Sequence, residues 1–424
     1  MKYLLSLFIL LVSIIGLYQN IQASDHSNDT WTVCASGCDF MTIASAVADI
    51  QVNPGDTLEL ANETFPEHDI LLDKDLTLVG EGQQMTTIDA QSLGRVISIT
   101  QGTIITIHDL TITGGYILNL SGNEFGAGIY NNGSLSLHNV SVENNIAELD
   151  SCGGGIFNNV LSTLLISDSF IYLNEAINHG SAGGLCNGGK ATINTSVIKE
   201  NIGWGTGAIG NGGTLTITQS IIEGNGGGVL GTVSNGEEGT AHIDKTVFTE
   251  NSGDDVIGNS GQMTIVNTTI SRNDGGGISN GGDMSVAFTT IAQNNHYGIT
   301  FAATLSIENS IIAQNGSGDC NQNIPVNITS LGANLTSDDS CVLSHPNDLP
   351  NTYPRLGPLA DYGGDTLVHA LLTGSPAIDA AVNCGTIAED QRGFPRPVGA
   401  ACDIGAFEGE VPFTSFYYLP VALR

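Results

Sequence analysis

The stretch that decides the fold is residues 275–294, which read GGGISNGGDMSVAFTTIAQN. It opens with glycines and Ile278, continues through the alternating Met284-Ser-Val286, and closes with Ile291-Ala-Gln-Asn294. Alternation of apolar and polar residues with period two is typical of a strand with one face in a core. A stretch this short cannot bury that face alone, so it indicates one unit of a stacked repeat.

Copies of this unit fill residues 126–315. Each copy opens with a glycine-rich turn that ends in an aliphatic residue, and closes with an apolar-x-x-Asn motif. The aliphatic residues assigned to the openings are Ile129, Ile156, Leu185, Ile209, Val229, Ile257, Ile278 and Ile299. The apolar and Asn residues of the closes are Val142 and Asn145, Ile171 and Asn174, Ile198 and Asn201, Ile222 and Asn225, Phe248 and Asn251, Ile270 and Asn273, Ile291 and Asn294, and Ile312 and Asn315.

The repeat predicts an all-β fold, a single-stranded right-handed parallel β-helix over about residues 55–318. Stacking would place one aliphatic side chain on the next at the ~4.8 Å spacing of neighbouring strands. Glycine permits a positive φ at the corners of the coil. Asparagine also tolerates the left-handed conformation, and its amide can hydrogen-bond along a stacked ladder. We therefore interpret the repeated Asn as structural rather than catalytic.

Residues 32–54 are predicted to cap the first rung. Phe40, Ile43, Val47 and Ile50 recur at helical spacing, which favours a helix over residues 39–50. Such a helix would cover the open edge of the first strands.

Residues 1–23 read as a secretory signal peptide. Lys2 supplies the positive end, the apolar run from Leu4 to Leu17 follows, and Ala23 and Ser24 provide a cleavage site. The run is shorter than the ~20 residues that a transmembrane helix needs. We expect a secreted or cell-surface protein, with the bacterial outer membrane as one such location.

The charge of the chain excludes nucleic acid as a partner. Eleven Lys and Arg residues stand against 43 Asp and Glu residues, which gives a net charge of −32. Phosphate backbones require a basic face. An anionic polysaccharide would also be repelled unless cations bridged it. The acidity is typical of a soluble extracellular repeat protein.

Eight cysteines in an exported chain indicate disulfide bonds. The local pairs are predicted to be Cys34 with Cys38, Cys320 with Cys341, and Cys384 with Cys402. Alignment of the repeats puts Cys152 opposite Ser181 rather than opposite Cys186. The sequence leaves the state of Cys152 and Cys186 open, and buried free thiols are the interpretation that this alignment favours. Neither residue has the Cys/His spacing of a zinc site.

The repeats resemble two groups of β-helix proteins. Their pattern is similar to that of the pectin-lyase-like superfamily, and the glycine-glycine-aliphatic opening with the apolar-x-x-Asn close resembles the repeat of chlamydial polymorphic outer membrane proteins. This resemblance covers residues 126–315 and implies a β-helix. The apolar residue of the close is more often Ile than Phe here, which departs from the second group.

Residues 319–408 resemble the bacterial choice-of-anchor Q domain. The motifs that carry the resemblance are Ser330–Leu335, Leu356–Gly364, Gly374–Asp379, Asp390–Pro397 and Cys402–Glu408. The resemblance implies a secreted or envelope location and a sorting segment at residues 409–424. Charged residues of this module are interpreted as structural, because turn-rich caps use such groups to satisfy loop backbone: Asp379, Asp390, Arg392, Arg396 and Asp403.

One set of side chains in the repeats stands out as a candidate site. Alignment places Asp254, Gly275 and His296 on successive rungs, with Asp255 and Asp274 beside them. Asp254 and His296 would then lie roughly 9–10 Å apart. These side chains are weak candidates for catalysis (Asp254, Asp255, His296) or for binding calcium (Asp254, Asp255, Asp274). Otherwise no cofactor is expected.

The enzymes that use this fold need more than this set. Hydrolases require an acid–base pair of carboxylates, and lyases require a base beside cation-binding carboxylates. The strong cations of the repeats lie in no motif of either group: Lys190, Lys199, Lys245 and Arg272.

We therefore expect a non-enzymatic surface or secreted protein that presents a long face for adhesion or glycan binding. A polysaccharide lyase or glycoside hydrolase is the first alternative, and a structural envelope protein the second. The expected partners are an extracellular polysaccharide or a cell-surface protein, with attachment to the envelope through residues 409–424.

Overall fold

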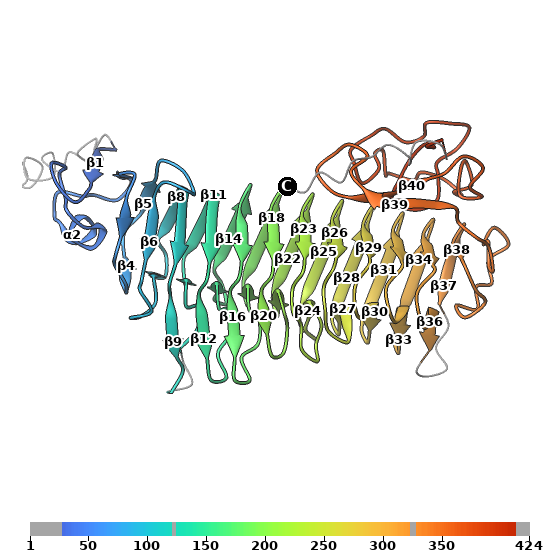
Figure 1. Cartoon of the computed structure of the whole chain (residues 1–424), viewed down its shortest axis with the longest axis horizontal. Coiled ribbons are helices and arrows are strands. Elements are labelled where there is room, and N and C mark those ends of the chain that lie inside the picture. Colours follow the sequence, from blue (N-terminus) through green and yellow to red (C-terminus); the bar gives the residue numbers. More distant parts are fainter. Residues whose placement is uncertain (1–27, 121–123, 323–327, 413–424) are drawn as a thin grey trace, which may run out of the picture.

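The computed structural model describes residues 28–120, 124–322 and 328–412. These residues form an elongated right-handed coil of parallel β-strands with almost no helix (Figure 1). The predicted fold class is confirmed. The predicted signal peptide lies outside the described residues.

Two strand ladders share one large sheet, because the long strands β8 (Ile104–Thr113) and β11 (Ser134–Glu143) belong to both. The first ladder contains their N-terminal halves with β1 (Thr30–Val33), β2 (Thr57–Leu60), β5 (Leu76–Val79), β14 (Thr163–Ser167), β18 (Lys190–Asn194), β22 (Thr214–Thr218), β25 (Thr240–Asp244), β28 (Gln262–Val266), β31 (Asp283–Ala287), β34 (Leu305–Glu308) and β37 (Thr329–Gly332). The second ladder contains their C-terminal halves with β3 (Thr64–Phe65), β6 (Thr87–Asp89), β15 (Phe170–Tyr172), β19 (Val197–Lys199), β23 (Ile221–Glu223), β26 (Val247–Thr249), β29 (Thr269–Ser271), β32 (Thr290–Ala292), β35 (Ile311–Ala313) and β38 (Leu335–Thr336).

Two further ladders complete the cross-section of the coil. The third ladder contains β4 (Ile70–Leu72), β7 (Ile97–Ile99), β10 (Ile129–Asn131), β13 (Ile156–Asn158), β17 (Leu185–Asn187), β21 (Ile209–Asn211), β24 (Val233–Asn235), β27 (Asp255–Asn259), β30 (Gly276–Asn280), β33 (Tyr297–Phe301) and β36 (Gly318–Gln322). The fourth is short and contains β9 (Tyr116–Leu118), β12 (Ile146–Glu148), β16 (Glu175–Ile177) and β20 (Ile202–Gly203).

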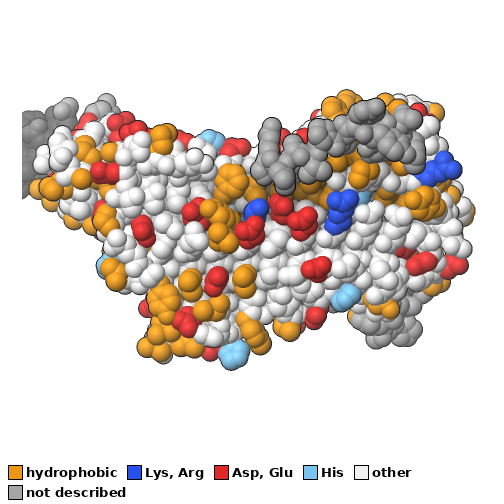
Figure 2. Space-filling view, in the orientation of Figure 1, with side chains coloured by type: hydrophobic (Ala, Val, Ile, Leu, Met, Phe, Trp, Pro, Cys, Tyr) orange, Lys and Arg blue, Asp and Glu red, His pale blue; other side chains and the backbone are white. Residues whose placement is uncertain are grey.

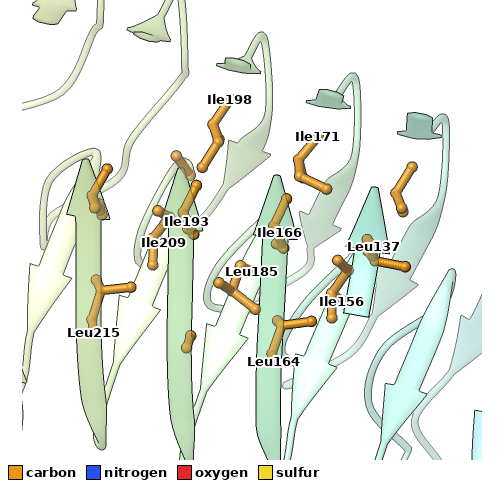
Figure 3. Close-up of a cluster of buried hydrophobic side chains, with 14 of the residues drawn as sticks. Leu137, Ile156, Leu164, Ile166, Ile171, Leu185, Ile193, Ile198, Ile209 and Leu215 are labelled. Atoms are coloured by element: carbon orange, nitrogen blue, oxygen red, sulfur yellow. The ribbon is translucent and has the colours of Figure 1, made fainter. Parts of the chain in front are cut away.

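The core consists of aliphatic side chains stacked rung on rung between the ladders (Figure 3). Ile166 pairs in register with Ile193, and Ile193 with Ile217, and all three are fully buried. Burial of each such side chain contributes about 1.5–3 kcal/mol. Because every rung repeats the same contacts, the coil is stabilised by many equivalent increments.

Two buried asparagine ladders run along the coil. Each Asn of the closing motif donates from its amide to the next, as Asn174 does to Asn201 at 3.0 Å. A second ladder, not predicted, joins Asn158 to Asn187 at 2.7 Å in the same manner. The left-handed residue is the one before the closing Asn, such as Leu173 with φ 53°, and not the Asn itself. The structural interpretation of the repeated Asn is confirmed.

One predicted opening is out of register. Val229 was assigned as the aliphatic anchor of its rung, but it is 64% exposed, and Val233 pairs with Ile209 and Ile257 instead. The reason is that the strand of this rung opens with Gly231-Thr-Val233, without a glycine pair, while the Gly226–Gly228 run lies in the turn before it. The glycine-glycine-aliphatic match therefore precedes the strand.

The coil extends beyond the predicted limits of 55 and 318. At its start, β1 pairs parallel with β2, and the predicted helix is limited to α2 (Ile43–Ala48), which begins at the Thr42 N-cap. Ile50, assigned to the helix face, is 94% exposed because the helix ends before it. At the other end, β37 and β38 continue the first and second ladders.

Four disulfide bonds are present: Cys34–Cys38, Cys152–Cys186, Cys320–Cys341 and Cys384–Cys402. Three are the pairs predicted from the sequence. The interpretation of Cys152 and Cys186 as free thiols is wrong. The turn before β13, with Gly153 at φ 75°, brings Cys152 toward the outward-facing Cys186 of the next rung, and the two Cα atoms lie 5.7 Å apart.

The C-terminal module, residues 339–412, has two parts. Residues 339–352 lie at the end of the coil, where Cys341 joins the coil's core and Leu349 bridges to Leu335, and residues 353–412 fold back along the flank (Figure 1). Its hairpin of β39 (Leu356–Ala360) and β40 (Val368–Leu371) lies beside the second ladder. His369 Nε2 lies 2.7 Å from Ser271 Oγ, and Gln391 Oε1 accepts from Thr269 at 2.6 Å. Within the described residues, no helix is long and apolar enough to cross a membrane.

Candidate functional site

A groove lies on the outer face of the second ladder, over the rungs that the C-terminal module leaves uncovered. Its volume is about 540 Å³. Its lining combines amides, hydroxyls, aromatic rings and charges: Gln83, Gln84, Thr87, Thr111, Thr113, Ser141, Glu143, Phe170, Tyr172 and Lys199.

The closing motif positions the charged residues of the groove. The first x of each apolar-x-x-Asn follows a buried residue on a strand, so its side chain points out of the coil. Glu143, Tyr172, Lys199 and Glu223 occupy this position on four successive rungs, each in register with the next. The resulting row of polar side chains crosses the face at ~4.8 Å steps.

A parallel row two residues earlier is mainly apolar. Phe170 pairs in register with Val197, and Val197 with Ile221. Phe170 is 41% exposed, and the two aliphatic side chains are half-buried. Figure 2 shows hydrophobic side chains beside a group of acidic and basic ones near the middle of this face. Phe170 lines the groove itself, and Val197 and Ile221 continue its row on the next two rungs, past the groove lining. The face is therefore amphipathic, with an apolar row that starts in the groove beside a charged row.

The Lys199 ammonium is held by acidic neighbours. Its Nζ lies 3.1 Å from Glu200 Oε1. Hydrogen bonding to Glu200, together with the charges of Glu223 and Glu250, raises the pKa of Lys199. Lys199 therefore stays charged at neutral pH and is already paired.

Glu143 forms a second polar centre in the groove. It accepts a hydrogen bond from Ser141 Oγ at 2.5 Å. Burial, followed by hydrogen bonding to Glu143, raises the pKa of the Tyr172 hydroxyl. Tyr172 is therefore a neutral hydrogen-bonding phenol beside a carboxylate, which suits it to bind and orient a polar ligand.

The residues predicted as a site lie elsewhere, on the third ladder. Backbone hydrogen bonds from Gly276 to Asp254 and from His296 to Gly275 give the rung alignment that was predicted. Asp255 lines a small cavity of about 220 Å³ together with Ser279. Burial and the charge of Asp254 raise the pKa of Asp255.

These residues do not assemble into a metal site. Asp274 is exposed and accepts from Asn295 at 3.2 Å. No group of three or more His, Cys, Asp or Glu side chains in the described ranges is placed to hold a metal ion. The calcium hypothesis for Asp254, Asp255 and Asp274 therefore gains no ligand set, and the catalytic role of Asp254, Asp255 and His296 stays a prediction.

Most of the charged residues of the C-terminal module form a buried network, and Asp379 is exposed. Asp390 accepts from Arg392 Nη2 at 2.6 Å, and Glu408 accepts from Arg396 Nη1 at 2.7 Å. Asp379 accepts from the Ala401 backbone N–H. Burial raises the pKa of Asp403, which accepts from Gly409 N–H, to about 6. These contacts hold loops together, as the structural interpretation expects.

The groove itself was missed by sequence reasoning, although a signal for it exists. The x positions of the closing motif carry Glu, Tyr, Lys and Glu from Glu143 to Glu223, and then Thr, Ser, Ala and Ala from Thr249 to Ala313. Large and charged x residues indicate rungs whose outer face is open to solvent. Small x residues indicate rungs whose outer face is covered by another part of the chain. That change was visible in the aligned repeats.

Comparison with known proteins identifies the fold. The pectate lyase Pel9A is similar over 90% of this chain and 97% of its own length, with 16% identity and a TM-score of 0.51. The catalytic domain of a GH87 α-1,3-glucanase in complex with nigerose (16% identity, 74% and 70% coverage, TM-score 0.45) and an alginate lyase from Paenibacillus sp. str. FPU-7 (14%, 72% and 99%, 0.41) are also similar. No family model and no curated sequence matches the chain. The likeness shows a pectate-lyase-like parallel β-helix.

Proposed function

We propose that this chain is an extracellular glycan-binding protein that holds a polysaccharide in the groove over β8, β11, β15 and β19. The observation that carries the proposal is the pairing of the apolar row at Phe170, Val197 and Ile221 with the polar row at Glu143, Tyr172 and Lys199. A pyranose ring has apolar C–H faces and a polar rim of hydroxyls. A groove with one apolar and one polar strip is complementary to such a ring.

The location of the protein agrees with this proposal. Four disulfide bonds indicate an oxidising, extracellular compartment. The resemblances of residues 126–315 to polymorphic outer membrane protein repeats and of residues 319–408 to the choice-of-anchor Q domain support a place at the bacterial envelope. The segment proposed for attachment, residues 409–424, lies outside the described residues beyond 412.

A carbohydrate-active enzyme is the second candidate. The observation that favours it is the Tyr172 phenol beside the Glu143 carboxylate, with the Lys199 ammonium on the next rung. A phenol, a carboxylate and an ammonium within one groove are groups that can donate or accept a proton. The binding hypothesis ranks first because the Lys199 ammonium is already occupied by Glu200.

The experiment that tests the proposal is affinity electrophoresis and calorimetry of the mature chain against a panel of soluble polysaccharides. We expect binding that Tyr172→Ala and Phe170→Ala reduce at least tenfold. Tyr130→Ala is the matched control, because Tyr130 is another half-buried, outward-facing tyrosine, on the third ladder. Binding that survives Tyr172→Ala, or no binding to any glycan, would reject the proposal. Cleavage of a polysaccharide that Tyr172→Phe abolishes would establish the enzyme instead.

A further inference from the structure

We infer that the groove selects a neutral over an anionic polysaccharide, that is, one without carboxylate or sulfate groups. The inference rests on the proposed function, since it names the class of glycan for the same groove. Three observations carry it: the negative sign of the charges around the groove, the ion pair that Lys199 already forms with Glu200, and the apolar row beside them.

The charges near the groove are predominantly negative. Glu143 lines the groove, and Glu200, Glu223 and Glu250 act on Lys199 at its end. The four carboxylates and the one ammonium together carry a net charge of −3. The chain as a whole, at −32, adds to the same field. A polyuronate brings one negative charge with each sugar, so its approach is opposed along the groove.

The single cation of the groove lining does not offset this repulsion. Lys199 Nζ already lies 3.1 Å from Glu200, and its raised pKa reflects carboxylates on three sides. Arg272, two rungs beyond Glu223, lies near the C-terminal module. There its charge opposes the rise that burial causes in the pKa of Tyr362 and adds to the lowering that burial causes in the pKa of His369. A bound uronate would therefore displace an existing ion pair to find a partner, which removes its electrostatic gain.

The same groups suit an uncharged sugar. A carboxylate has two acceptor oxygens and can accept from neighbouring hydroxyls, while the amides of Gln83 and Gln84 both donate and accept. Such charge-assisted hydrogen bonds are stronger than neutral ones. The apolar row of Phe170, Val197 and Ile221 adds contact area that is indifferent to charge. A polyamine glycan would be drawn to the carboxylates but would not require this row.

The experiment measures the affinity of the full mature chain for a β-glucan, an α-glucan, a galactomannan, polygalacturonate, alginate and chitosan, at low and high salt and with or without calcium. We expect a neutral member to bind at least tenfold more tightly than polygalacturonate, with little salt dependence. Chitosan serves as the cationic comparison, and any binding of it should weaken as salt is added. Residual uronate binding should strengthen as salt screens the repulsion. All binding should require Tyr172.

A pair of charge variants sharpens the test. Glu223→Gln with Glu250→Gln removes two carboxylates at the groove and should raise polygalacturonate affinity several-fold at low salt. Glu237→Gln with Glu238→Gln removes the same charge from an exposed turn between the third and first ladders, and should change nothing. Equal effects of the two pairs would overturn the assignment of selectivity to the groove.

The outcomes separate this inference from the proposed function. Tyr172-dependent binding that prefers a uronate, with or without calcium, would overturn the inference while leaving glycan binding intact. Absence of any Tyr172-dependent binding would reject the proposed function itself.

Discussion

The second ladder has two halves that share one backbone and differ in what lies outside it. From β11 to β23 its outward row reads Glu143, Tyr172, Lys199 and Glu223, and the row lines an open groove or adjoins it. From β26 to β35 the same row reads Thr249, Ser271, Ala292 and Ala313, each 0–3% exposed under the C-terminal module. The inner residues of the closing motif do not change between the halves.

The comparison shows that each closing motif determines both the packing of the coil and the character of its outer surface. Its apolar residue and its Asn build the coil, whereas its x residues specify the surface. Where the x residue is small, a second layer packs on the sheet, with Phe288, Ala292 and Ile311 in a shared core with Val368 and Leu371. Where it is large and charged, the face remains in solvent.

The largest effect should come from placing a charge under the module. Ala292→Arg inserts a guanidinium at a fully buried position, and we expect a loss of about 3–5 kcal/mol of unfolding free energy from an unpaired buried charge. Limited proteolysis should then cleave residues 339–412 first. The matched change in the open half, Thr113→Arg, should alter stability by less than about 0.5 kcal/mol. Similar losses for both variants would break the distinction between the halves.

Acidification should weaken the covered half next. His369 donates from Nδ1 to Gly357 O and accepts at Nε2 from Ser271, so it is neutral, and burial lowers its pKa to about 4. The folded pKa lies below the unfolded value of 6.5, so the unfolded chain binds more protons. The contribution of His369 to stability is therefore complete above pH 6.5 and falls by about 3 kcal/mol as the pH drops to 4. Asp403, whose pKa burial raises to about 6, contributes with the opposite sign over the same range, so the comparison with a His369 variant isolates the effect of the histidine.

Chemical denaturation between pH 4 and 7.5 measures this effect. His369→Gln should flatten the slope, because glutamine retains a donor and an acceptor without titrating in this range. The charge of Arg272 opposes protonation in the same direction as burial. An unchanged slope in the variant would assign the acid sensitivity to other groups.

A smaller and equal effect should follow in both halves when the asparagine ladder is cut. Asn174 lies in the open half and Asn273 in the covered half, and each donates to the next Asn at 2.8–3.0 Å. Each change to Ala leaves neighbouring amide and backbone groups unsatisfied, at about 1–3 kcal/mol. Equal losses in melting experiments would confirm that the scaffold is common to the two halves, and a loss confined to one half would contradict it.

The smallest effect on stability should come from the groove cation. Lys199→Met removes an exposed ion pair with Glu200, for which about 0.2–1 kcal/mol is the usual contribution. Glycan affinity should nevertheless fall, because Lys199 lines the groove. Thermal melting and calorimetry on the same sample separate the two effects. A large drop in melting temperature would mean that Lys199 is part of the scaffold.

The fold was predictable because its signals are local and repeated. Ile270-x-x-Asn273 and Ile291-x-x-Asn294 have the same spacing. Because the motif recurs in every rung, an error in aligning one copy does not change the predicted fold. The errors occurred where one copy departs from the rest. Val229 matched the opening motif, but the strand of that rung opens with Gly231-Thr-Val233, and only the pairing of Val233 with Ile209 reveals it.

The groove and the Cys152–Cys186 bond were not predictable in the same manner. Both depend on which outward side chains meet across rungs. The outward row from Glu143 to Ala313 separates an open face from a covered one, but it does not state which side chains meet there. Cys152 lies in a turn and Cys186 on a strand, so linear alignment of the copies offsets them. Likewise, no linear feature states that Gln391 and His369 return to cover Thr269 and Ser271.

The return of the C-terminal module along the flank restricts where rungs can be gained or lost during evolution. The module is attached at several rungs at once, from Gln219 with Asp365 to Asn309 with Asn383. If a whole rung were gained or lost between those points, the residues of the coil that contact the module would no longer lie opposite their partners in the module. A rung gained between β8 and β19 moves none of them and adds one more position to the groove. Duplication is therefore free to vary the reach of the open half, whereas the covered half is fixed in length by the layer that rests on it.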